Sequence, residues 1–198
     1  MRVLFFDTET SGFPEKGGKL VQLAATICDF SFDPPLVVQE FSSLVKCEEI
    51  PQVVIDIHGI TPEMAAHGME PTAICKWFKG AVSKVALIVA HNSSFDVKMM
   101  DFEFRRAEMG GFSPSAVFCT MMASTDLCEL PGRFGKPKWP KLSEALPILC
   151  GIELDGAHDA LVDTRGCKTL FIELVKRGLV PQLSNKPTPK PETQDNLI

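Results

Sequence analysis

The chain has 198 residues, enough for one domain of ordinary size with a substantial core. Hydrophobic residues make up 45% of it, but no stretch is apolar over the roughly 20 residues that a membrane-spanning helix needs. We therefore expect no membrane segment. The formal net charge of −5, taken alone, argues against a nucleic-acid ligand.

The cysteines indicate the chemical environment of the protein. There are seven of them, an odd number, and they are scattered along the chain without a C-x-x-C pair. This pattern is typical of reduced, mostly buried thiols and not of a disulfide framework or a zinc site. We expect a cytoplasmic protein.

The first strand carries two acids at its end. Residues 3–6 are four apolar residues in a row, which predicts a strand buried on both faces, and Gly12 ends it. Because side chains alternate along a strand, Asp7 and Glu9 should point to the same side as Val3 and Phe5. Two neighbouring carboxylates at the edge of a core repel each other, and a Mg²⁺ or Mn²⁺ ion would explain them. The alternative is a solvated turn that carries two acids.

The following segments predict an α/β fold with a mixed sheet. Residues 20–29 and 37–45 read as strands joined by a turn at 33–35, which makes an antiparallel meander with the first strand. Residues 57–63 read as a loop that enters a helix at Pro62, with Thr61 as its N-cap. A helix over 72–82 and an apolar strand over 86–90 then begin an alternation of strands and helices.

Asp96 is a third candidate acid. Ser93 or Ser94 is a natural N-cap, which places Asp96 in the first turn of the next helix. A first-turn acid often does no more than interact with the helix dipole. Its i+3 and i+4 neighbours are Met99 and Met100, however, so its face should pack inward. His91 and Asn92, just before the helix, are suited either to local capping or to contact with a ligand.

Asp163 is the fourth acid, and His158 precedes it. Asp163 lies on one helical face with Cys167, Leu170 and Leu174, and an acid on an apolar stripe needs a partner. On a continuous helix, His158 would point away from Asp163. Both reach one site only if His158 lies in the lead-in before the helix. Otherwise His158 is an ordinary solvated loop histidine.

Four motifs in order resemble one enzyme family. Phe-Asp-Thr-Glu-Thr-Ser-Gly at 6–12, Ile-His-Gly-Ile-Thr at 57–61, Ala-His-Asn-Ser-Ser-Phe-Asp at 90–96 and His158-x4-Asp163 are similar to those of the DEDDh (DnaQ-like) 3′–5′ exonucleases. That group includes the proofreading subunit of bacterial replicative DNA polymerase. The resemblance implies a ribonuclease H-like fold, a mixed five-stranded sheet flanked by helices. A sister group uses tyrosine in place of the histidine, but this chain contains no tyrosine.

The resemblance also implies a site. Asp7, Glu9, Asp96 and Asp163 would bind two Mg²⁺ or Mn²⁺ ions, and His158 would take the proton from the attacking water. Thr10 and His58 would contact the terminal nucleotide, and the product would be a nucleoside 5′-monophosphate. Two divalent ions add four positive charges and would leave a net charge of −1, so the acidic composition does not exclude a nucleic-acid substrate.

A basic loop at 131–141 is a candidate for binding the strand. It carries four positive charges, no acid and two aromatic residues. Lys136 and Lys138 would contact phosphates while Trp139 stacks on a base. The alternative is a surface loop whose Trp139 plugs the core ahead of a helix over 142–150.

We predict an exonuclease domain over residues 1–180 and a disordered tail over 181–198, which is rich in proline and lysine. The tail ends in Gln194-Asp195-Asn196-Leu197-Ile198. This end resembles the peptides by which bacterial replication proteins dock on the sliding clamp, and a frayed terminus is the alternative.

The expected substrate is a single-stranded or frayed 3′ end of DNA. An RNA-trimming member of the same family is an alternative, because the motifs do not report the sugar. A non-catalytic nucleic-acid or polymerase-binding module is another, although such a module has no need of four acids and His158.

Overall fold

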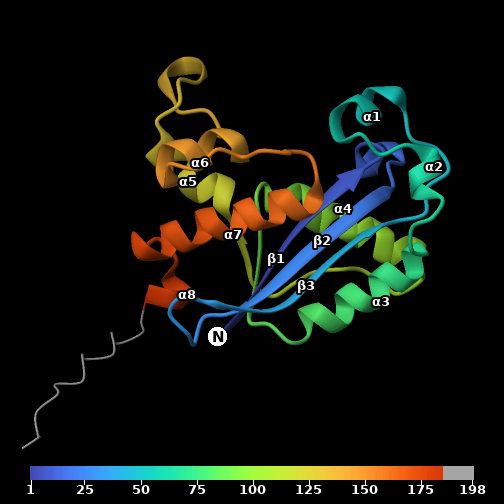
Figure 1. Cartoon of the computed structure of the whole chain (residues 1–198), viewed down its shortest axis with the longest axis horizontal. Helices are drawn as coiled ribbons and strands as arrows, with labels where there is room; N and C mark the ends of the chain where they lie inside the picture. The colour runs from blue at the N-terminus through green and yellow to red at the C-terminus, as the bar shows by residue number, and fades with distance from the viewer. Residues whose placement is uncertain (185–198) are drawn as a thin grey trace, which may run out of the picture.

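The computed structural model of this chain describes residues 1–184 and contains a five-stranded sheet (Figure 1). The strand order is β3-β2-β1-β4-β5. β2 pairs antiparallel with both β1 and β3. β4 pairs parallel with β1, and β5 pairs parallel with β4. The predicted mixed sheet with an antiparallel meander is confirmed. The strands are Arg2–Thr10 (β1), Leu20–Asp29 (β2), Leu36–Leu44 (β3), Leu87–Ala90 (β4) and Val117–Cys119 (β5).

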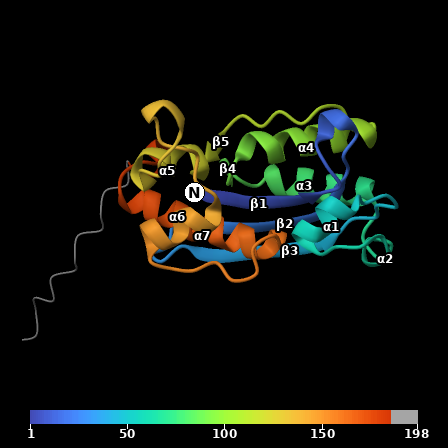
Figure 2. The ribbon, with the colours of Figure 1, turned by 90° about the horizontal axis from the view of Figure 1, so that it is seen from above.

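Helices cover both faces of the sheet, with α3 and α4 on one side and α6 and α7 on the other (Figure 2). Within residues 1–184, no helix has the length and apolar character to cross a membrane. The helices are Gln52–His58 (α1), Pro62–Ala65 (α2), Pro71–Val82 (α3), Ser93–Arg106 (α4), Thr120–Cys128 (α5), Leu142–Cys150 (α6), Ala160–Lys176 (α7) and Pro181–Ser184 (α8), with short 3₁₀ turns at Pro14–Lys16 and Arg133–Gly135.

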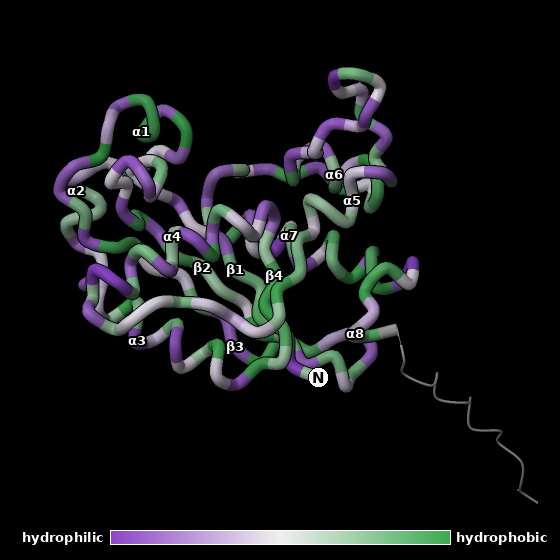
Figure 3. Tube along the Cα trace, turned by 180° about the vertical axis from the view of Figure 1, so that it is seen from behind, coloured by the Kyte–Doolittle hydropathy of each residue, from purple (hydrophilic) through white to green (hydrophobic). Residues whose placement is uncertain are grey.

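β1 lies at the centre of two hydrophobic cores. Val3 and Phe5 pack with residues of α6 and α7, whereas Leu4 and Phe6 pack with residues of α3 and α4. All four side chains are fully buried. The unbroken apolar run therefore reflects a strand covered on both faces, as predicted. Figure 3 shows the hydrophobic trace of β1 and β4 in the middle of the molecule.

One local feature near the site differs from the expectation. His58 was placed in a loop, but it is the last residue of α1, a seven-residue helix that ends at Gly59 with a left-handed φ of 74°. This helix has no side-chain N-cap, and its Val53 and Ile57 are exposed, so the sequence lacks the usual helix signals. Thr61 does cap α2 as predicted.

The folded part of the chain continues past the predicted boundary at residue 180. Residues 181–184 form α8, and Val180 and Leu183 pack into the core beside α7. The rest of the predicted tail, including the clamp-like end at 194–198, lies outside the described residues. All seven cysteines are unpaired, and five of them are buried.

Candidate active site

The candidate site lies where two parallel strands end. β1 and β4 run side by side with Phe5 opposite Val89, so the residues that follow each strand emerge at the same edge. Asp7 and Glu9 come from the end of β1, and Asn92 follows β4. This edge is where open α/β sheets usually bind ligands.

Asp96 reaches this edge from α4. Its side chain is 3% exposed, and its Oδ1 atom accepts a hydrogen bond of 2.8 Å from the Thr8 hydroxyl. Met99 and Met100 are fully buried, so the inward face predicted for this helix is confirmed. The predicted serine cap is wrong. Asn92 occupies the N-cap position with a φ of 70°, and its own side chain makes no capping hydrogen bond within the described part of the chain.

His158 and Asp163 come from the start of α7. Asp159 is the N-cap, so His158 lies before the helix, as the sequence predicted. His158 has a left-handed φ of 71°, and its backbone N–H donates to Asp163 Oδ2 at 3.0 Å. Donor atoms of Glu9, His158 and Asp163 all lie within 4.8 Å of one another and could hold a metal ion.

The acids at this edge interact strongly. Burial raises the pKa of Asp7 well above its usual value, and the charges of Asp96, Asp163 and Glu9 raise it further. Burial and the neighbouring acids raise the pKa of Glu9 to about 8, and burial raises that of Asp96 to about 7. Burial also raises the pKa of Asp163. In the absence of a cation, the protein therefore holds protons at this site near neutral pH.

A divalent cation fits the residues present. The Oδ1 atom of Asp163 is buried and has no hydrogen-bond partner in the described part of the chain. A buried carboxylate oxygen without a donor is costly, and a cation would satisfy it. The four acids offer carboxylate oxygens, which Mg²⁺ and Mn²⁺ prefer, and a ring nitrogen of His158 lies within 4.8 Å of the Glu9 and Asp163 oxygens.

The raised pKa values predict how stability depends on pH. A carboxyl group with a raised pKa makes the folded state bind more protons than the unfolded state, so stability falls as pH rises from about 4 to the folded pKa. For Glu9 this window extends to about pH 8. In EDTA, we expect the melting temperature of Glu9→Gln to fall less between pH 5 and 8 than that of the wild type. Saturating Mn²⁺ should remove most of this difference, because it stabilises the ionised carboxylates. If the melting temperatures of the two proteins in EDTA fell by the same amount between pH 5 and 8, the prediction would be contradicted.

An open cleft of about 500 Å³ adjoins the acids. Trp139 is 63% exposed and lines this cleft, so the alternative in which it plugs the core is wrong. Lys141 lines the cleft as well, whereas Lys136 and Lys138 do not, and Lys138 pairs with Glu144 at 2.6 Å. The residues shared by the cleft and the site predictions are Asp7, Asn92, Trp139, His158 and Asp163.

His58 lies close to the backbone of Thr10, the residue that follows Glu9 in β1. Burial lowers the pKa of His58, the Thr10 backbone opposes this shift, and the charge of His158 adds to it. His58 Nδ1 accepts a hydrogen bond of 3.0 Å from the Ile60 N–H. Its Nε2 atom is buried and makes no hydrogen bond of normal geometry within residues 1–184, even to the nearby Thr10 backbone.

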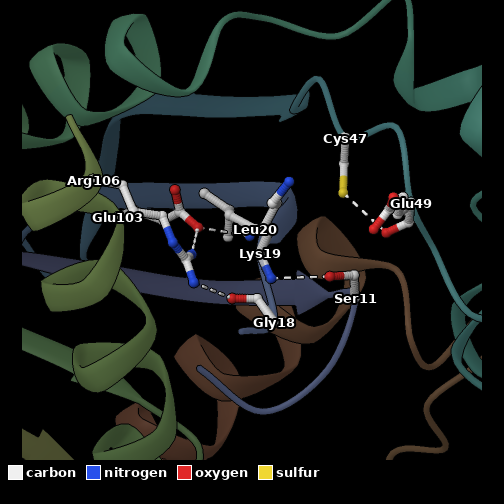
Figure 4. Close-up of polar contacts among 8 residues, drawn as sticks. All are labelled: Ser11, Gly18, Lys19, Leu20, Cys47, Glu49, Glu103 and Arg106. Carbon is white, nitrogen blue, oxygen red and sulfur yellow. Dashed lines mark hydrogen bonds and ion pairs between the residues drawn. The ribbon is translucent and has the colours of Figure 1, made fainter. Parts of the chain in front are cut away.

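The loop that follows β1 is fastened to α4 (Figure 4). Ser11 Oγ accepts from the Lys19 N–H at 2.9 Å, and Arg106 donates to the Gly18 carbonyl at 2.8 Å. Glu103, which is 3% exposed, accepts from both the Leu20 N–H and Arg106. These contacts fix the chain on both sides of residues 11–19, next to the strand end that carries Glu9.

Some residues at the site were not singled out from the sequence. Asp159 contributes charge to both Asp7 and Glu9, and Gln22 of β2 donates to its carboxylate at 3.2 Å. The aspartate just before an apolar helix is a recognisable N-cap signal. Nothing in the sequence pairs it with Gln22. His91 joins Thr120 to the Pro140 carbonyl, with both contacts at 3.0 Å, and so ties the loop that carries Trp139 to the end of β4.

Comparison with known proteins places the chain in a family. A profile described as an exonuclease, of the RNase T family, matches residues 4–171. The chain belongs to this exonuclease family. The predicted recognition is therefore confirmed.

Related proteins are longer than this exonuclease chain. It is 28% identical over 175 residues to the PolC-type DNA polymerase III of Staphylococcus aureus. The aligned residues make up 87% of this chain but 11% of the polymerase. Escherichia coli exonuclease I in complex with a dT13 oligonucleotide superimposes with a TM-score of 0.72 at 22% identity, covering 88% of this chain and 41% of that one. A second structure of that enzyme, with a 5cy-dT13 oligonucleotide, superimposes with a TM-score of 0.75 at 20% identity, covering 92% of this chain and 42% of that one. These structures share the fold of the exonuclease chain.

Proposed function

We propose that this exonuclease chain removes nucleoside 5′-monophosphates from the 3′ ends of single-stranded DNA. The observation that carries the proposal is the convergence of Asp7, Glu9, Asp96 and Asp163 on one sheet edge, with His158 beside them. The similarity to exonuclease I bound to oligo-dT supports a single-stranded DNA substrate. The similarity to a PolC-type polymerase is consistent with a role in replication or repair. The unpaired cysteines fit a reducing, cytoplasmic location.

The four carboxylates would hold two Mg²⁺ or Mn²⁺ ions. When bound, such ions stabilise the negative charge that develops on a phosphodiester during hydrolysis. His158 is exposed at the mouth of the site, within 4.8 Å of the Glu9 and Asp163 oxygens. From there it accepts the proton of the attacking water. The lead-in before α7 orients the backbone of His158, because its N–H is bound to Asp163.

The substrate strand would follow the cleft. Trp139 offers an exposed ring for stacking on a base, and Lys141 offers a charge for a phosphate. Asn92 lines the same cleft. Thr10 follows Glu9 in β1 and lies beside His58, and these two residues would contact the terminal nucleotide. Lys136 and Lys138 precede Trp139 in the basic loop and lie outside the cleft, so they would contact phosphates only of a longer DNA strand. A partner for the C-terminal peptide stays a prediction of the sequence.

A digestion series tests the proposed function. Oligonucleotides labelled at the 5′ end, as single-stranded DNA, duplex DNA and RNA, would be incubated with the full chain and Mg²⁺, Mn²⁺ or EDTA. We expect single-stranded DNA to shorten from its 3′ end one nucleotide at a time, fastest of the three substrates, and to remain intact in EDTA. Faster digestion of RNA would make the chain an RNA-trimming enzyme. Loss of the labelled 5′ nucleotide first, or no cleavage of any substrate, would refute the proposal.

The cleft residues should govern substrate binding and leave chemistry unchanged. Loss of one stacked base costs ~1–3 kcal/mol, so Trp139→Ala combined with Lys141→Ala should raise KM on single-stranded DNA at least about tenfold with kcat nearly unchanged. Steady-state kinetics at several salt concentrations should also show a shallower salt dependence. The matched pair is Lys141→Ala and Lys136→Ala, which each remove one positive charge from the same loop, inside and outside the cleft, so Lys136→Ala should raise KM less than Lys141→Ala does. Equal effects of these two single variants would indicate that the lysines act only through the net charge of the loop.

A further inference from the structure

Gln22 connects the sheet to the beginning of α7. It lies on β2 directly opposite Glu9, and it is 7% exposed. Its Nε2 atom donates to Asp159 Oδ2 at 3.2 Å, and its Oε1 atom accepts from the Ala160 N–H at 3.2 Å. One buried amide therefore binds both the N-cap residue and the first residue of the helix.

The segment that Gln22 binds determines the direction of His158. Asp159 Oδ1 accepts from the N–H groups of Leu161 and Val162 while Oδ2 accepts from Gln22, so this carboxylate is fully engaged. His158 precedes it in a left-handed conformation that is uncommon outside glycine. Among residues 1–184, no hydrogen bond to the His158 ring is found. The ring is therefore placed by its backbone, and Gln22 holds the next two residues of that backbone.

We infer that Gln22 is a positioning residue, which sets the His158 ring against the Glu9 edge of the sheet. This inference rests on the proposed function, since it concerns the base of that reaction. The role needs an amide, because the same side chain must donate to a carboxylate and accept from an N–H. Glutamate in this place would add a charge beside Asp159 and the four acids. Leucine would fill similar space but leave the Ala160 N–H and the Asp159 oxygen without a partner.

The control is chosen from the same face of the same strand. Thr26 lies four residues after Gln22 on β2, so its side chain points to the same face of the sheet. It is fully buried and donates a hydrogen bond to Glu40 at 3.4 Å. Thr26→Val removes that hydrogen bond without changing the size of the side chain and lies away from the acids. A general effect of loosening β2 should appear in this variant as well.

The decisive experiment crosses Gln22→Leu with His158→Ala. Loss of a residue that orients a functional group typically costs about 10–100-fold in activity, so Gln22→Leu should lower kcat on single-stranded DNA by this factor with KM and Mn²⁺ affinity little changed. In the His158→Ala background, the same substitution should change kcat less than about twofold, because the two residues act as one unit. Thr26→Val should have the wild-type kcat. Gln22→Glu should also lower kcat, because glutamate cannot donate to the Asp159 carboxylate.

A second readout does not depend on activity. The chain has four histidines, so the His158 imidazole resonance in a nitrogen-15 spectrum of the metal-free protein can be assigned by its absence in His158→Ala. We expect this resonance to shift in Gln22→Leu and to stay in place in Thr26→Val. An unmoved resonance, or an equal loss of kcat with and without His158, would overturn the positioning role. If the wild-type chain degrades no nucleic acid, the proposed function fails, but the spectrum still tests what Gln22 positions.

Discussion

Replacing Asp7 by alanine is expected to abolish hydrolysis while the fold survives. Asp7 interacts with Glu9, Asp96 and Asp163, so its loss removes the group shared by the whole cluster. Divalent ions contribute several kcal/mol to phosphodiester hydrolysis, which corresponds to a loss of at least about 10³-fold in kcat. The measurement is the rate of mononucleotide release from single-stranded DNA at saturating Mg²⁺.

The same variant should be more stable than the wild type without metal. Burial and four neighbouring acids oppose ionisation of Asp7, so alanine relieves both the repulsion and the desolvation of a carboxylate. We expect a higher melting temperature in EDTA and a smaller stabilisation by Mn²⁺. Asp126→Ala is the matched control, because this aspartate is exposed on α5 outside the cleft. Full activity of Asp7→Ala at saturating Mg²⁺ would remove Asp7 from the metal site.

Replacing His158 by alanine is expected to lower kcat by about 10²–10⁴-fold, the usual contribution of a positioned general base. KM and the Mn²⁺ affinity should change little if His158 handles the proton and not the metal. The His158 ring lies close enough to Glu9 and Asp163 for the three groups to bind one ion together, so a role as metal ligand is the alternative to be tested. Calorimetric titration with Mn²⁺ separates the two roles. A collapse of Mn²⁺ affinity would make His158 a metal ligand, and His67→Ala, which changes an exposed histidine after α2, provides the control.

The acids were predictable from short-range patterns. Strand alternation places Asp7 and Glu9 on one face, and the burial of Val3 and Phe5 on that face agrees. Helical periodicity brings Asp96 and Asp163 inward, because Met99 and Cys167 on the same stripes are buried. The α/β fold with a mixed sheet was expected from the order of strands and helices in the sequence. Its ribonuclease H-like character was expected from the four motifs, which is a resemblance and not a derivation from residue patterns.

Other parts of the site depend on long-range contacts that no local pattern reports. Gln22 and Asp159 are 137 residues apart, and only the folded sheet brings them together. Trp139 was equally suited to the core and to the surface, and the choice follows from where His91 fixes the Pro140 carbonyl. α1 escaped prediction because two of its apolar residues, Val53 and Ile57, are exposed, so they do not mark a buried stripe.

The most direct test of the metal site is a crystal structure of the full chain soaked with Mn²⁺ and a nucleoside 5′-monophosphate, with anomalous scattering recorded at the manganese edge. We predict two anomalous peaks among the carboxylates of Asp7, Glu9, Asp96 and Asp163. One of them should contact Asp163 Oδ1, the buried oxygen that has no hydrogen-bond partner among residues 1–184. The His158 ring should stand clear of both peaks. The absence of any peak among these four carboxylates at saturating Mn²⁺ would contradict a divalent metal centre at this edge of the sheet.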